Sequence, residues 1–132
     1  MSSPRAIVDE LARAAAAGEA VVLATVVRVV GSSYGGVGAR MLVRVDGSTV
    51  GLVSGGCLES DLAAHARRVH DAGTAAVVAY DTRADDDGVW GLGLGCNGLI
   101  EVLLEPLAPP AAGALAALLR AALAAEQAGV LA

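Results

Sequence analysis

Two cysteines, each preceded by a glycine, are the residues of this chain best suited to chemistry. One lies in Ser54-Gly55-Gly56-Cys57-Leu58-Glu59, and the other lies in Gly93-Leu94-Gly95-Cys96. Glycines allow close approach to the backbone, so a ligand at either segment can contact amide groups and a thiol together. We therefore predict that these two segments carry the function.

The first segment follows a predicted strand, and Cys57 opens a predicted helix. Free N–H groups and the positive end of the helix dipole would converge there, which favours a phosphate-like anion and stabilises a thiolate. We expect Cys57 to be the more reactive cysteine. A second interpretation stays open, in which Gly55-Gly56 only form a turn and Glu59 and Asp61 only complement the helix dipole.

A third glycine-rich stretch, Gly31-Ser32-Ser33-Tyr34-Gly35-Gly36-Val37-Gly38, follows a predicted buried strand and adds two serine hydroxyls. Each stretch alone is a weak signal, because glycine-rich loops are common. Three of them at strand ends favour a ligand-binding site.

The spacing of the cysteines and histidines argues against a zinc site. Zinc prefers four ligands in short paired spacings, whereas Cys57 and Cys96 are 39 positions apart. His65 and His70 would point about 140° apart on a helix. We predict no metal site, and a disulfide between Cys57 and Cys96 stays open because the sequence does not give their separation.

Composition limits the class of protein. A chain of 132 residues fits one domain, and 55% of the residues are apolar without any Phe, so the core must consist of Val, Leu, Ala and Ile. The net charge of −5 and nine scattered arginines argue against a nucleic-acid partner. The first residues lack the apolar run of a signal peptide, so we predict a cytoplasmic protein with reduced thiols.

Residues 108–132 are almost entirely Ala and Leu. Pro109-Pro110, Arg120 and Glu126-Gln127 make a membrane span a poor interpretation, so no membrane partner is predicted. A helix that is apolar nearly all round needs cover on several sides, and we predict that a homo-oligomer provides it.

Apolar periodicity and turn residues predict the order of elements. The predicted helices are 4–17, ended by Gly18, and 58–72, ended by Gly73; the predicted strands are 21–30, 41–45, 49–53, 75–80 and 99–104. Asp46-Gly47 favours a tight hairpin, and residues 81–97 form a long loop. The order predicts an α/β fold, a mixed β-sheet with packed helices, in a single compact domain.

Four motifs in register over about residues 18–105 resemble the N-terminal domain of the XdhC/CoxI family. They are Ala24-Thr25-Val26 leading to Gly31-Ser32-Ser33, then Gly38-Ala39-Arg40-Met41, Ser54 to Glu59, and Gly93 to Cys96. Members of this family are accessory proteins for molybdenum hydroxylases such as xanthine dehydrogenase and carbon monoxide dehydrogenase. Residues 1–132 would form one such domain, without the C-terminal Rossmann-like domain of many relatives.

The resemblance implies that the chain transiently binds molybdenum cofactor (molybdopterin), assists its sulfuration and inserts it into the apo-enzyme. A cysteine desulfurase would be a further partner. The implied cofactor-binding residues are Gly31, Ser32, Ser33, Arg40, Ser54, Gly55, Gly56, Cys57, Glu59, Gly93, Gly95 and Cys96. Such a protein is a chaperone rather than a turnover enzyme.

Two alternatives stay open. In the first, the chain is a sulfur-transfer enzyme with Cys57 as nucleophile or persulfide carrier. In the second, it is an interaction module that has lost cofactor binding, because Tyr34-Gly35 stands where the family usually has Pro-Arg and thus lacks a cation.

Overall fold

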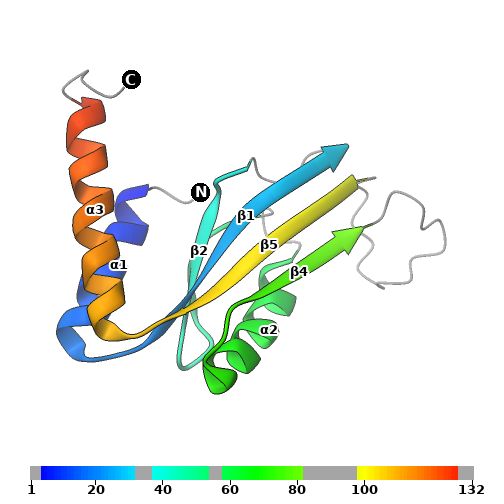
Figure 1. The fold of residues 1–132 in the computed structure, drawn as a ribbon, viewed down its shortest axis with the longest axis horizontal. Coiled ribbons are helices and arrows are strands. Elements are labelled where there is room, and N and C mark those ends of the chain that lie inside the picture. The colour runs from blue at the N-terminus through cyan, green and yellow to red at the C-terminus, as the bar shows by residue number, and fades with distance from the viewer. Residues whose placement is uncertain (1–3, 32–36, 54–57, 82–97, 128–132) are drawn as a thin grey trace.

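The computed structural model describes residues 4–31, 37–53, 58–81 and 98–127. The elements are α1 (Pro4–Ala17), β1 (Val21–Gly31), β2 (Arg40–Arg44), β3 (Thr49–Gly51), α2 (Glu59–Ala72), β4 (Ala76–Asp81), β5 (Gly98–Leu107) and α3 (Pro109–Gln127). One helix lies beneath the sheet, and the other two stand together beside it (Figure 1).

The predicted α/β fold with helices packed on a sheet is confirmed, but the sheet is antiparallel rather than mixed. The five strands lie in the order β3-β2-β1-β5-β4, and each described pairing is antiparallel. The crossover helix α2 does join two strands that run in the same direction, β3 and β4. These strands form the opposite edges of the sheet, so they never pair with each other.

The larger core lies between α2 and one face of the sheet. Its fully buried side chains come from alternate strand positions and from one face of α2: Val22, Ala24, Val26, Met41, Val43, Leu58, Leu62, Ala66, Tyr80, Ile100, Val102 and Leu104. This alternation is expected of strands with one face against a helix. The core fixes α2 along the sheet.

The other face carries a smaller core with α1 and α3. Ile7, Val8 and Leu11 of α1 pack on Leu23 and Leu42 of the sheet. Alanines on both helices allow close contact between them, and α3 packs mainly on α1 rather than on the sheet. Among the described helices none is long and apolar enough to span a membrane.

The strand predicted at 21–30 is confirmed as β1. A continuous apolar run also predicts burial on both faces, and this is found only in the first half of the strand. Residues 21–24 are buried, whereas Val27 is 43% exposed. The pairing of β1 with β2 stops at Thr25, while its pairing with β5 continues to Gly31. The second half of β1 therefore extends beyond the cover of β2.

Candidate functional site

All three glycine-rich stretches leave the sheet at the same end. Because neighbouring strands are antiparallel, β1, β3 and β4 finish at the end where β2 and β5 begin. We call this the loop end and mark it by Gly31, Arg40, Gly51, Asp81 and Gly98. Figure 1 shows β1 and β4 pointing to it and β5 starting from it. Segments far apart in the sequence thus have their flanks in one place.

Gly31 and Gly98 bring the flanks of two predicted segments into direct register. Gly31 is the last residue of β1 and pairs with Gly98, the first residue of β5. Gly31 has φ of 83°, a conformation that side chains disfavour, and Gly98 is buried. Neither residue carries a side chain, and of the two backbones the exposed one of Gly31 is accessible at this end of the sheet.

Glu59 links the two residues that flank the segment around Cys57, because its side chain bonds to the backbone of Val53. Its Oε2 accepts a hydrogen bond of 2.7 Å from the backbone N–H of Val53, and only 8% of the residue is exposed. Val53 and Leu58 flank residues 54–57 and are themselves buried. Glu59 is therefore an anchor of the segment, and its place in the first turn of α2 also complements the helix dipole.

Tyr80 and Asp61 tie the start of α2 to the end of β4. The hydroxyl of Tyr80 donates a hydrogen bond to Oδ2 of Asp61, and the tyrosine ring is fully buried. Burial, followed by this hydrogen bond, raises the pKa of Tyr80 far above its ordinary value, so the phenol stays protonated and acts as a donor. Oδ2 of Asp61 also lies 3.3 Å from Nε2 of His65.

Sequence reasoning missed this link. The sequence patterns place Tyr80 only in a strand and Asp61 only near the helix dipole, and their separation of 19 positions gives no periodic signal. The available clue was chemical: a buried tyrosine needs a partner for its hydroxyl. The pair places the first turn of α2 beside the end of β4.

Arg40 lies at the loop end but on the opposite face of the sheet from Glu59. Met41 and Val43 face α2, so the alternating residue Arg40 faces α1 and α3. It lines a cavity of about 460 Å³ with residues of both helices, among them Ile7 and Leu123. The structure therefore does not bring the side chains of Arg40 and Glu59 together.

Nine predicted site residues lie outside the described residues. They are Ser32, Ser33, Ser54, Gly55, Gly56, Cys57, Gly93, Gly95 and Cys96. Their roles, and the separation of the two cysteines, stay predictions. Over residues 4–31, 37–53, 58–81 and 98–127, no three His, Cys, Asp or Glu side chains gather closely enough to hold a metal ion.

This architecture defines an α/β domain in which the strand ends that flank the glycine-rich connections lie at one end of the sheet. The profile of the family described as "XdhC and CoxI family" matches residues 14–81, just over half of the chain, and the chain belongs to this family. The matched range includes the glycine-rich stretches 31–38 and 54–59 and ends before Gly93. The resemblance carried by the sequence motifs is confirmed.

Two relatives extend the match. The chain is 46% identical over 87 residues to a probable xanthine dehydrogenase subunit of Bacillus subtilis (strain 168), and this match covers 66% of this chain and 26% of that protein. A crystal structure of a xanthine dehydrogenase from Bacillus halodurans matches with a TM-score of 0.71 and 41% identity, covering 92% of this chain and 36% of that chain. The chain thus spans about a quarter to a third of the length of these relatives.

Proposed function

We propose that the chain is an accessory protein for molybdenum hydroxylases, and that its loop end binds molybdenum cofactor during sulfuration and insertion into the apo-enzyme. Membership of the XdhC and CoxI family supports the accessory role, and the names of both relatives support xanthine dehydrogenase as the associated enzyme. The observation that carries the proposal is the convergence of the flanks of three motif segments at one end of the sheet.

The residues at the loop end fit such a group. Molybdopterin has a phosphate, a polar pterin and sulfur ligands to a metal. Gly31 leaves an exposed backbone without a side chain at this end, and Tyr80 and Asp61 link the first turn of α2 to the end of β4. Thiolates are suitable ligands for soft metal centres, and Cys57 and Cys96 belong to segments that leave from this end.

The described residues refine which side chains would touch the cofactor. The glycine, serine and cysteine residues of the three segments would hold it through amides, hydroxyls and thiols. Glu59 would position the segment around Cys57, because its carboxylate already accepts the Val53 N–H. The bound cofactor would supply the molybdenum centre of the client enzyme.

Cofactor retention tests the proposal directly. The full chain would be incubated with molybdenum cofactor and passed through a desalting column, and the retained pterin would be measured by fluorescence. We expect wild type to retain pterin and Cys57→Ala to retain less than about a tenth as much, with a smaller loss for Cys96→Ala. Val45→Ala is the matched control, because Val45 is 53% exposed and lies at the other end of the sheet. A wild-type chain that retains no pterin would overturn cofactor binding.

Sulfur transfer needs a separate measurement. The chain would be incubated with a cysteine desulfurase and cysteine, and persulfide would then be located by mass spectrometry of the intact protein and its peptides. A carrier role predicts one added sulfur on Cys57. The Cys57 thiolate would attack the outer sulfur of the desulfurase persulfide, and the desulfurase cysteine would leave as a thiolate. If neither cysteine gains sulfur, the chain does not carry sulfur itself, and cofactor binding is judged by pterin retention alone.

A further inference from the structure

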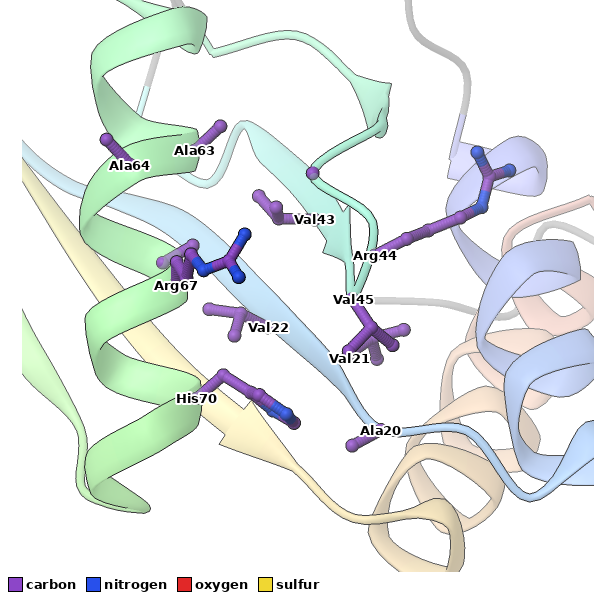
Figure 2. A pocket seen from close by; sticks show the side chains of 12 residues that line it. Ala20, Val21, Val22, Val43, Arg44, Val45, Ala63, Ala64, Arg67 and His70 are labelled. Atoms are coloured by element: carbon purple, nitrogen blue, oxygen red, sulfur yellow. The ribbon is translucent and has the colours of Figure 1, made fainter.

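A second cavity lies at the end of the sheet away from the glycine-rich segments. We call this the turn end and mark it by Val21, Arg44, Thr49 and Ala76, where β1, β3 and β4 begin and β2 finishes. The cavity has a volume of about 230 Å³ and lies between α2, the start of β1 and the hairpin of β2 and β3 (Figure 2). The three described residues predicted to bind cofactor, Gly31, Arg40 and Glu59, do not line it.

The walls of this cavity are apolar and made of small side chains. Val22 and Val43 come from the sheet, and Ala63 and Ala66 come from α2. The alanines leave the space open, because a larger side chain at either position would fill it. Drug-sized ligands occupy roughly 300–1,000 Å³, so this cavity suits a smaller apolar group such as one ring or a short branched chain.

Two side chains of α2 supply positive charge or hydrogen-bond donors at the cavity. Figure 2 shows the guanidinium of Arg67 reaching from α2 toward β2 and the imidazole of His70 pointing toward Ala20. Arg67 makes no ion pair or hydrogen bond with another residue in the described part of the chain, and it is exposed. Its donors are therefore available to a ligand.

Two other charged groups near the cavity, Arg44 and Asp46, already have partners. Arg44 also lines it, but its side chain points away toward α1 and donates two hydrogen bonds of 2.9 Å to Glu10. Asp46, next to the lining residue Gly47, accepts hydrogen bonds from the backbone and hydroxyl of Ser48. Among the described residues that line the cavity, the unpartnered charge is thus the cation of Arg67.

We propose that this cavity binds a small organic acid. The carboxylate contacts Arg67, with His70 as a second donor, and the ring or branched chain lies between Val22, Val43 and Ala63. A carboxylate with an apolar group uses both parts of the cavity, whereas inorganic phosphate uses only the cation. The site is separate from the loop end, so the proposal does not depend on cofactor binding.

Benzoate is a suitable probe because it combines one ring with one carboxylate. Binding to the full chain would be followed by two-dimensional amide NMR, with shifts expected at the residues that line the cavity. Benzamide has nearly the same shape without the charge, and it should bind at least about tenfold more weakly, since hydrogen bonds to charged groups are the stronger class. Inorganic phosphate should also bind more weakly than benzoate.

Arg67 and Arg68 give a matched pair of variants. Both are exposed residues of α2, but only Arg67 lines the cavity, and Arg68 instead contacts His65. We expect Arg67→Gln to weaken benzoate binding by about tenfold and Arg68→Gln to change it less than about twofold. His70→Gln should give an intermediate loss.

The proposal is overturned by any of three results. Benzoate could fail to shift the resonances of the cavity residues, benzamide or phosphate could bind as tightly as benzoate, or Arg67→Gln and Arg68→Gln could weaken binding equally. Arg67 has no described partner, so its substitution should leave the fold intact, and the amide spectrum of each variant checks this in the same experiment.

Discussion

The two ends of the sheet are held together by different kinds of interaction. At the loop end, two carboxylates accept hydrogen bonds from neutral donors: Glu59 accepts the Val53 N–H, and the half-exposed Asp61 accepts from the buried Tyr80. At the turn end, the carboxylate of Glu10 joins α1 to β2 through an arginine network. The loop end therefore depends on hydrogen bonds from neutral donors to carboxylates, and the turn end depends on ion pairs between one buried carboxylate and two arginines.

The difference has a functional meaning. Glycine-rich segments give little packing of their own, so the cofactor site proposed for them would need firm anchors in the elements beside it. The turn end has a short hairpin loop with hydrogen bonds between Arg44 and Ser48, and its cavity is built by rigid elements. One end is suited to a large ligand held by backbone groups, and the other to a small one held by side chains.

The largest difference between the two ends is expected in the free energy of unfolding that is lost when a glycine is replaced by alanine. Gly51, at the loop end, has φ of 93°, and a Cβ there would lie 2.7 Å from the Arg40 carbonyl oxygen and 2.9 Å from Ile7 Cδ1. We expect Gly51→Ala to lower the free energy of unfolding by about 3–5 kcal/mol, through backbone strain and a clash with main-chain atoms. Urea denaturation measures the loss.

Gly47 provides the control for this substitution at the turn end. It has φ of 90°, but a Cβ there would meet nothing within 4 Å. Gly47→Ala should therefore cost only about 1 kcal/mol, from strain alone. Equal losses at the two positions would show that close packing around Gly51 is unimportant.

Acid should remove the ion pairs that Glu10 makes at the turn end. Hydrogen bonds from Arg13 and then Arg44 lower the pKa of Glu10 to about 2, from an ordinary value of 4.5. Because the pKa is lower in the folded state, the stabilisation is complete above about pH 5 and is lost as the pH falls toward 2. Wild type should lose about 3 kcal/mol more than Glu10→Gln over this interval, measured by denaturation at each pH. Parallel losses in the two proteins would exclude Glu10 as the acid-sensitive group.

The link between Tyr80 and Asp61 should be the main polar anchor of the loop end. Tyr80→Phe removes the donor and leaves the buried ring in place, so we expect a loss of about 2 kcal/mol in the free energy of unfolding. Asp61→Asn and the double variant complete a cycle that isolates the pair. Additive losses would mean that the two groups act independently.

An exposed ion pair on the strands near the loop end should contribute least. Arg28 and Glu101 face each other across β1 and β5 with 3.7 Å between nitrogen and oxygen, and the arginine side chain is 57% exposed. Arg28→Gln should change the free energy of unfolding by less than about 0.5 kcal/mol. A larger loss would mean that charge also stabilises this end, and the contrast between the ends would weaken.

Local sequence signals predicted most elements correctly. Gly18 and Gly73 end α1 and α2 with φ near 70°, as glycines after helices commonly do, and Asp46-Gly47 forms the predicted hairpin. The order of strands was harder to predict, because the placement of β5 between β1 and β4 depends on contacts between distant segments. The same limit applies to Pro106, which pairs with Val22 near the end of β5, where a proline is not expected from propensity alone.

For the candidate site too, local motifs were predictable from the sequence, whereas contacts between distant segments were not. Glycine and cysteine motifs pointed to three segments, and the antiparallel topology accounts for the shared end from which they leave. Arg40 belongs with them by motif, but strand alternation turns its side chain to the other face. The acid-binding cavity had no sequence signal, because Val22, Val43 and Arg67 meet only in the folded chain.

The position of β5 also affects how the chain is synthesised. β1 is made early and can pair with β2 at once, but its other edge waits for β5, which is the last of the described strands to leave the ribosome. β4 pairs only with β5, so it too has no neighbour until then. During translation the growing chain therefore exposes an apolar strand edge, the kind of surface that pairs with other chains when it is left uncovered.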